Sequence, residues 1–271
     1  MQTQTTKPLA ERVPVVSGSA EAVHRVPAPN PEMRSDAARG STSPRRAAVI
    51  AGIGYVALFV LAIFANFVVF EGMVVADDPA ATAANISDAP GLFRLGIVAF
   101  VAVFVIDVVV AWALFVLFRE KDRDLSLVSA WFRLAYTVML GVAAVFLVQA
   151  LQLLDGSSFL GGIDSESLQA QALVSLDTFE AAWLIGLVAF GLHLVLLGVL
   201  LVRSQTAPRM LALLLVVAGA AYVTDTAAHF LLGNYEQYGS VFLAMVAVPS
   251  VVAEGWFALW LLSKAGRNAR Q

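Results

Sequence analysis

Six long apolar runs follow one another between residues 47 and 263, and they limit what this chain can fold into more than any other feature. We place them near 47–70, 92–118, 131–154, 180–202, 209–232 and 240–263. Each run is long enough for the ~20 helical residues that cross about 30 Å of hydrocarbon. Strands of a membrane barrel would alternate polar and apolar residues, so helices are expected. The sequence therefore predicts an all-α, polytopic membrane helix bundle with six transmembrane helices.

The composition argues against several other classes of protein. Hydrophobic residues make up 59% of the 271 residues and charged residues only 14%, whereas soluble domains carry about 25% charged residues. A soluble enzyme is therefore strongly disfavoured. The formal net charge of −3 argues against a nucleic-acid-binding protein. Because the chain has no cysteine, disulfides, thiolate nucleophiles and cysteine-based metal sites are excluded.

The first 46 residues have a different character from the rest of the chain. Six prolines lie there among Ser, Thr, Ala and scattered charges, and no stretch keeps a helical or strand period. Such a segment cannot bury enough apolar area to offset its chain entropy. We therefore expect a disordered cytoplasmic tail over 1–46, the six-helix transmembrane domain over 47–266, and a short cytoplasmic C-terminal tail over 267–271.

Outside the apolar runs, basic residues lie on one side of the predicted helices only. They precede the first apolar run, lie between runs 2 and 3 and between runs 4 and 5, and follow the last run. The opposite loops, 71–91, 155–179 and 233–239, contain acidic residues and no Lys or Arg. The positive-inside rule then predicts that both termini are cytoplasmic. We expect a multi-pass protein of the cell inner (plasma) membrane, with the lipid bilayer as its surroundings.

The first of these acidic loops is predicted to contain a short helix. Asp77 or Asp78 stands before Pro79, and an acidic cap followed by proline is typical of a helix start. We expect a helix from Pro79 to Ile86. Asp88 is then expected to cap the second membrane helix, with Pro90 in its first turn.

Polar side chains inside the apolar runs form two groups by depth. A charge at the centre of a membrane helix costs about 2.5–3.5 kcal/mol on insertion scales, so each one needs a reason. The outer group consists of Asn66, Arg94, Gln149, Gln152, Glu180, Asp225 and His229. Within this group Arg94 is the single cation outside the cytoplasmic side and its margin, so it is expected to pair with a carboxylate in a cluster joining runs 2 to 5. The alternative is a structural polar cluster at the membrane interface.

The deeper group comprises Asp107, His193 and Glu254, on runs 2, 4 and 6. At ~1.5 Å per residue, all three lie about 20–22 Å from the outer ends of helices that point the same way. If these side chains converge, they form a proton-binding site whose carboxylates share a proton. The alternative is that each is a separate hydrogen-bonded packing contact between helices.

Three classes of function remain open. The first is binding or transport of a small solute or proton through the deep group. The second is a membrane-embedded, metal-dependent hydrolase, for which Asp225, His229 and Glu180 are a chemically acceptable divalent-cation site. The third is a structural or accessory subunit that binds another membrane protein. No Gly-x-Ser-x-Gly, no Gly-x-x-x-x-Gly-Lys-Ser/Thr and no His-Glu-x-x-His occurs. No cofactor is predicted, and catalysis is the less favoured reading.

Short sequence pieces along the membrane part resemble a known family. Residues 78–86 read DPAATAANI and residues 92–96 read LFRLG. Shorter pieces are FRL at 132–134, FGLH at 190–193, PRML at 208–211, AGAAY at 218–222 and LWLL at 259–262. Together they resemble a bacterial integral-membrane family known as domain of unknown function 4386, across residues 46–266. The resemblance implies a multi-span inner-membrane protein and implies no activity.

Overall fold

The structure is a computed structural model that describes residues 42–156 and 160–265. These residues form helices and no strands. Six helical segments are long and apolar enough to cross a membrane, which confirms the predicted all-α bundle with six spans. The long helices are α2 (Pro44–Ile63), α5 (Pro90–Phe118), α6 (Arg123–Leu154), α7 (Ser165–Ser204), α8 (Arg209–Leu231) and α9 (Gly239–Trp260).

Short helical segments extend or connect these helices. The π-helix η1 (Phe64–Phe70) and the single turn α3 (Glu71–Met73) continue α2 without a break. The 3-10 turn η3 (Tyr235–Tyr238) precedes α9, and the π-helix η4 (Leu261–Ala265) follows it.

The predicted tails lie mostly outside the described residues. This holds for residues 1–41 of the N-terminal tail and for the whole of 267–271. Within the described part, α2 begins at Pro44, where the Ser43 hydroxyl accepts a hydrogen bond from the Arg46 amide at 3.4 Å. The first membrane helix therefore begins slightly before residue 47.

Two aspartates start α6 and α7 well before the predicted residues 131 and 180. Asp122 accepts from the Leu125 amide at 3.1 Å, and Asp164 accepts from the Ser167 amide at 2.8 Å. These hydrogen bonds satisfy amides in the first turn that have no partner within the helix. The second half of the expected loop 155–179 is therefore helical. The prediction was wrong there because hydropathy marks only the part of a helix that fits in hydrocarbon.

The short helix of the first acidic loop is α4 (Pro79–Asp88), as predicted. Asp78 caps it by accepting from the Ala81 amide at 2.9 Å, and α4 packs against α7. The cap expected from Asp88 was wrong, because Asp88 is the last residue of α4. Helix α5 begins at Pro90 after Ala89, with no side-chain cap.

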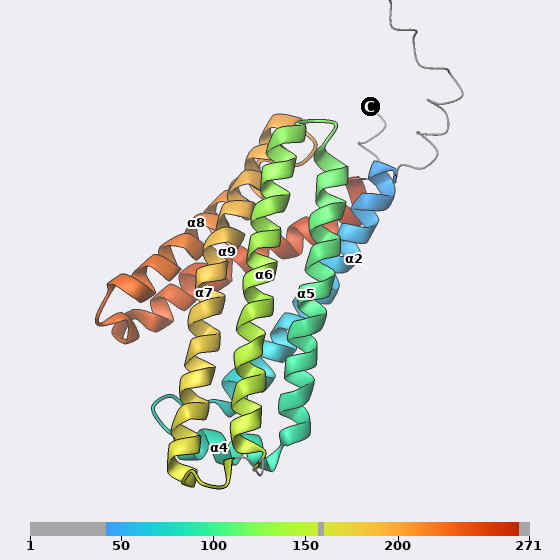
Figure 1. Ribbon diagram of the computed structural model, residues 1–271. Helices are drawn as coiled ribbons and strands as arrows, with labels where there is room; N and C mark the ends of the chain where they lie inside the picture. The colour runs from blue at the N-terminus through green and yellow to red at the C-terminus, as the bar shows by residue number, and fades with distance from the viewer. Residues whose placement is uncertain (1–41, 157–159, 266–271) are drawn as a thin grey trace, which may run out of the picture. The chain divides into compact units, whose positions relative to one another are not determined.

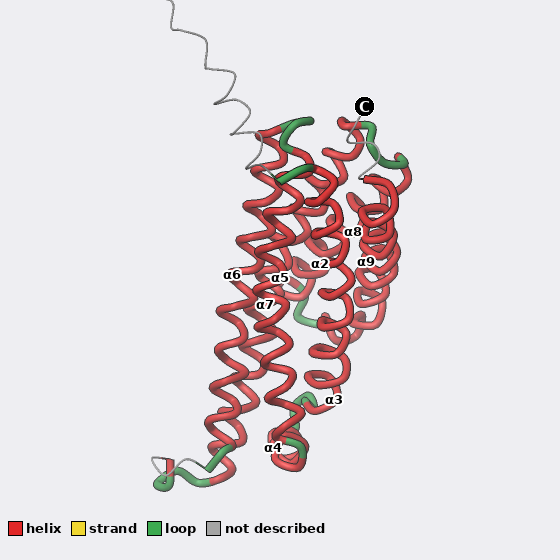
Figure 2. The backbone as a smooth tube through the Cα atoms, turned by 90° about the vertical axis from the view of Figure 1, so that its right-hand side faces the viewer, coloured by secondary structure: helices red, strands yellow, loops and turns green. Residues whose placement is uncertain are grey.

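The six long helices form a closed ring in chain order. Each of α2, α5, α6, α7 and α8 packs against the next helix, and α9 returns to pack against α2. Consecutive helices run up and down, so the starts of α2, α6 and α8 lie at the same end of the bundle as the ends of α5 and α7 (Figure 1). Figure 2 shows α4 near the opposite end.

Helices α7 and α8 approach each other backbone to backbone. A Cβ atom on Gly191 would lie 2.5 Å from the Gly219 carbonyl oxygen, and one on Gly198 would lie 2.6 Å from the Ala212 carbonyl oxygen. Any side chain at these glycines would push the helices apart. Glycine at these positions therefore fixes α8 closely to α7.

Candidate functional site

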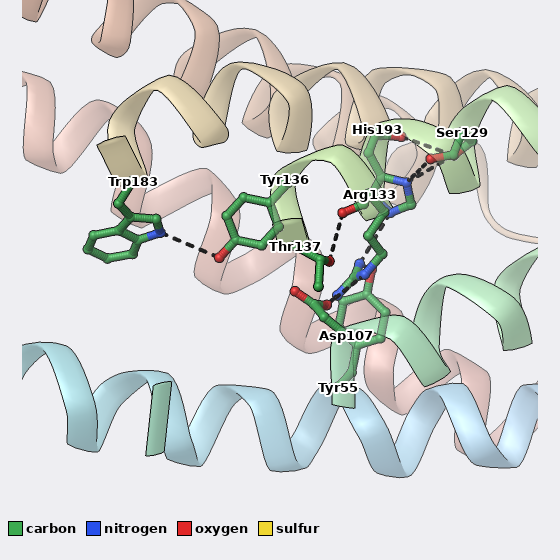
Figure 3. Close-up of polar contacts among 8 residues, drawn as sticks. All are labelled: Tyr55, Asp107, Ser129, Arg133, Tyr136, Thr137, Trp183 and His193. Carbon is green, nitrogen blue, oxygen red and sulfur yellow. Dashed lines mark hydrogen bonds and ion pairs between the residues drawn. The ribbon is translucent and has the colours of Figure 1, made fainter. Parts of the chain in front are cut away.

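The most buried charged group lies in the first half of α6. The Arg133 side chain is enclosed by the bundle, with 1% of its surface exposed. Its Nε donates to Asp107 Oδ1 at 2.8 Å, and its Nη2 donates to the same oxygen. Its Nη1 donates to the Tyr55 hydroxyl at 2.7 Å. One guanidinium therefore joins α6 to α5 and α2 (Figure 3).

The same guanidinium fixes the protonation of His193 on α7. Arg133 Nη1 lies 3.2 Å from His193 Nε2, and a guanidinium can only donate. Nε2 must therefore accept, which places the imidazole proton on Nδ1, where the Ser129 carbonyl oxygen accepts it at 2.9 Å. His193 is thus a neutral imidazole. Its two ring nitrogens join α7 to α6 at two points.

Aromatic rings cover the guanidinium on its faces. The central carbon of Arg133 lies 4.8 Å from the Tyr55 ring centre and 5.4 Å from the Phe190 ring centre. These cation–π contacts stabilise a charge removed from water. Phe257 of α9 meets the Tyr55 ring edge-on at 5.4 Å, so α9 packs against the outside of this group.

We call Tyr55, Asp107, Ser129, Arg133 and His193 the Arg133 network. It joins four helices, and every buried side-chain nitrogen and oxygen in the described part of the chain has a hydrogen-bond partner. That completeness matters because an unpaired polar group in a low-dielectric interior is costly. The network is therefore a preorganised, filled arrangement of one cation, one carboxylate and one neutral imidazole.

Glu254 of α9 lies beside this network and is half-buried. It interacts electrostatically with both Arg133 and Asp107. Tyr222 of α8 interacts electrostatically with its carboxylate. The three residues predicted to share one depth are thus associated with one arginine. Asp107 and His193 bind Arg133 directly, and the Glu254 carboxylate interacts with it electrostatically.

Arg133 itself, the centre of the site, was missed by the sequence reading. The third run was expected to begin at residue 131, which assigned Arg133 to the cytoplasmic margin. Helix α6 begins at Arg123, so Arg133 lies ten residues, or about 15 Å, inside it. The cap at Asp122 is the signal that could have found it. Tyr55 and Ser129 were missed too, since a hydroxyl in an apolar run has no distinguishing pattern.

The outer polar residues do not form one cluster around Arg94. Arg94 pairs with Asp155, which follows α6, at 3.0 Å, and both side chains are exposed. Asn66 donates to Glu71 at 3.0 Å, and Gln149 and Gln152 are exposed. The expected cluster was wrong because Asp155, just beyond the end of α6, lies nearer to Arg94 than the carboxylates of α7 and α8.

Asp225 and His229 do share a face of α8, where they meet Tyr235. The Tyr235 hydroxyl donates to Asp225 Oδ1 at 2.7 Å, and the His229 ring lies edge-on to the Tyr235 ring at 4.6 Å. Glu180 of α7 is exposed and interacts electrostatically with His229. Among residues 42–156 and 160–265, no group of three His, Asp, Glu or Cys could hold a metal ion. The divalent-cation site considered for Glu180, Asp225 and His229 is therefore not formed.

Six helices of membrane-crossing length around a buried arginine–carboxylate network define a multi-pass membrane protein with a polar centre. The chain matches the family model described as "Domain of unknown function (DUF4386)" over residues 50–265, and it belongs to this family. The family resemblance is thereby confirmed. A relative from Archaeoglobus fulgidus, named "Uncharacterized protein", is 26% identical over 168 residues, which cover 62% of this chain and 82% of the relative. No solved structure matches the chain.

Proposed function

We propose that this protein binds a proton on Glu254, beside the Arg133 network, and couples that binding to the movement of a small solute across the membrane. The observation that carries the proposal is the charge balance around Arg133. Asp107 already neutralises Arg133 through two guanidinium nitrogens, and His193 is neutral. An ionised Glu254 would leave the centre with one excess negative charge. In a low-dielectric interior the protonated acid is the favoured form.

The groups that face Glu254 support a proton rather than a larger ion as its ligand. Arg133 of α6, Asp107 of α5 and Tyr222 of α8 all act on it electrostatically. Tyr55 and Tyr136 also lie within its field. Because the Arg133 network is fully hydrogen-bonded, a solute has no vacant polar group to bind there unless a helix moves. A proton needs no such space.

Coupling to helix movement follows from where Glu254 lies. It is carried by α9, which packs against α8 and α2 and has the smallest buried share of the six membrane helices. An ionised Glu254 is attracted to Arg133 and repelled by Asp107, whereas a protonated one is not. Taking up a proton therefore changes how α9 is held against the bundle.

Infrared spectroscopy of the purified protein in lipid tests proton binding directly. The native protein is expected to show the carbonyl stretching band of a protonated carboxylic acid, which shrinks as the pH rises. The band should be lost in Glu254→Gln and kept in Glu236→Gln, a matched control at an exposed carboxylate. In vesicles that contain a pH-sensitive dye, Glu254→Gln should also slow proton entry under a pH gradient. A band unchanged in Glu254→Gln would overturn the proposal.

We further propose that the protein lies in the inner membrane with both termini in the cytoplasm. The helix ends rich in Arg and Lys lie at one end of the bundle, and the acidic segments around α4 and before α7 lie at the other (Figure 1). Helix α7, with 40 residues, is about 60 Å long and thus extends well beyond about 30 Å of hydrocarbon. Its first turns and α4 would then project outside the cell.

Cysteine labelling tests this orientation cleanly, because the chain has no cysteine of its own. A membrane-impermeant thiol reagent added to intact cells should modify Ser165→Cys at the start of α7. It should modify Glu120→Cys, between α5 and α6, only after the membrane is opened. The reverse pattern would contradict the orientation.

A further inference from the structure

The two halves of α9 differ sharply in packing. From Gly239 to Pro249, no side chain is buried. From residue 250 onwards, five side chains of α9 are buried: Ser250, Ala253, Phe257, Ala258 and Trp260. The inner half and η4 after it also pack against α2: the Phe257 ring contacts Tyr55, and a Cβ on Gly52 would meet the Leu262 side chain of η4 at 2.7 Å. The outer half has no comparable anchor along its length.

Pro249 lies at the boundary between the two halves. Proline lacks an amide donor, so the carbonyl of Met245 has no hydrogen bond from the following turn. The next residue, Ser250, donates its hydroxyl to the Val246 carbonyl at 2.7 Å. Helices often bend where a backbone hydrogen bond is missing, and also where a serine hydroxyl bonds to a carbonyl of the preceding turn. Both features occur here.

Tyr235 attaches the outer end of this half to α8. Its ring stacks on Phe242 of α9 at 5.2 Å, and its hydroxyl donates to Asp225 of α8 at 2.7 Å. Helix α8, in contrast, packs backbone to backbone against α7 at Gly191 and Gly198. A weakly buried half-helix thus lies between a bend at Pro249 and a polar attachment at Tyr235.

We infer that the outer half of α9, Gly239–Pro249, is a gate that bends at Pro249 and opens Glu254 to the outer, acidic side of the protein. Tyr222 of α8 lies near both Glu254 and Ser250, which are one turn apart on α9. Swinging the outer half aside uncovers Ser250 and Tyr222, and through them Glu254. The inference rests on the proposed function, since it supplies the route by which a proton from outside reaches Glu254.

The rate at which a thiol at residue 250 reacts tests the gate. In Ser250→Cys, a membrane-impermeant thiol reagent on the outer side should modify the cysteine slowly. Adding Pro249→Ala restores one backbone hydrogen bond and should slow the reaction roughly three- to tenfold, whereas adding Tyr235→Phe removes the outer attachment and should speed it by a similar factor. Ala143→Cys, fully buried on α6, is the control that should stay unmodified.

Two further measurements distinguish a folding defect from a failure of the gate or of proton binding. Each variant is checked for a single symmetric peak on size-exclusion chromatography, and Ala247→Cys, one turn nearer the loop, replaces Ser250→Cys if that variant misfolds. Equal rates in the native, Pro249→Ala and Tyr235→Phe backgrounds would overturn the gate. If the rates differ as expected while the infrared band survives in Glu254→Gln, the gate stands and proton binding at Glu254 fails.

Discussion

The chain contains the same ion pair, arginine with aspartate, in two opposite surroundings. Arg133 and Asp107 each expose 2% of their side chains, whereas Arg94 and Asp155 expose 58% and 39%. The buried guanidinium also binds Tyr55 and His193 and lies against two aromatic rings. For the exposed Arg94, the side-chain bonds among the described residues are those to Asp155.

The comparison teaches that chemical identity does not set the energetic role of an ion pair. In water a pair is screened, and holding two flexible side chains together costs entropy. In a low-dielectric interior the desolvation penalty is large, so losing one partner leaves the other stranded. The inner pair should therefore determine whether the bundle folds, while the outer pair should scarcely affect it.

The largest effect is expected from breaking the inner pair on one side only. Arg133→Met should lower the free energy of unfolding by about 3–5 kcal/mol, because Asp107 is left as an unpaired buried charge. The double variant Arg133→Met, Asp107→Leu should recover most of that loss. Thermal unfolding in detergent measures both. A single variant as stable as the native protein would show that Asp107 is not held by Arg133.

A smaller effect is expected from removing one hydrogen-bond acceptor while keeping the ring. Tyr55→Phe leaves Arg133 Nη1 without the hydroxyl at 2.7 Å and should cost about 1–3 kcal/mol. Tyr238→Phe, at an exposed tyrosine, is the matched control and should change the melting temperature little. Equal melting temperatures for the two variants would mean that the Tyr55 hydroxyl adds nothing to the network.

The outer pair should contribute little. Arg94→Ala is expected to cost about 0–1 kcal/mol, since both partners are exposed. Whatever contribution it makes should shrink as salt is added, because the screening length is about 10 Å at 0.1 M. Melting curves at low and high salt check this. A loss as large as that of Arg133→Met would remove the contrast between the two pairs.

The smallest effect concerns Asp122, the cap of α6 at the opposite end of the bundle from α4. The Leu125 amide, and then Arg203 at 3.0 Å, hold the pKa of Asp122 below its ordinary value. A lowered carboxyl pKa stabilises the fold above about pH 4, and this contribution is lost as the pH falls through the lowered value. Near neutral pH the melting temperature of the native protein should therefore be slightly higher than that of Asp122→Asn. In acid the two melting temperatures should be equal. A gap that widens in acid would contradict this.

Much of the fold could be predicted from local sequence, whereas only part of the candidate site could. Hydropathy found six helices, and Asp78 before Pro79 located α4, because both signals act within a few residues. Depth along each run placed Asp107, His193 and Glu254 at one level, and the structure associates all three with Arg133. The depth of Arg133 was not predicted, because the third helix was expected to begin at residue 131 and not at Arg123.

By itself, the sequence determined that this chain forms six membrane-length helices, with basic residues at one end and acidic residues at the other. Those properties depend on residue type and position along one helix. Only the tertiary structure decided which polar groups pair, because pairing depends on how helices are rotated and spaced. Arg133 reaches Tyr55, Asp107 and His193 on three other helices. Arg94 is also an arginine in an apolar run, yet its side-chain partner among the residues that the structure describes is an aspartate at the exposed end of α6.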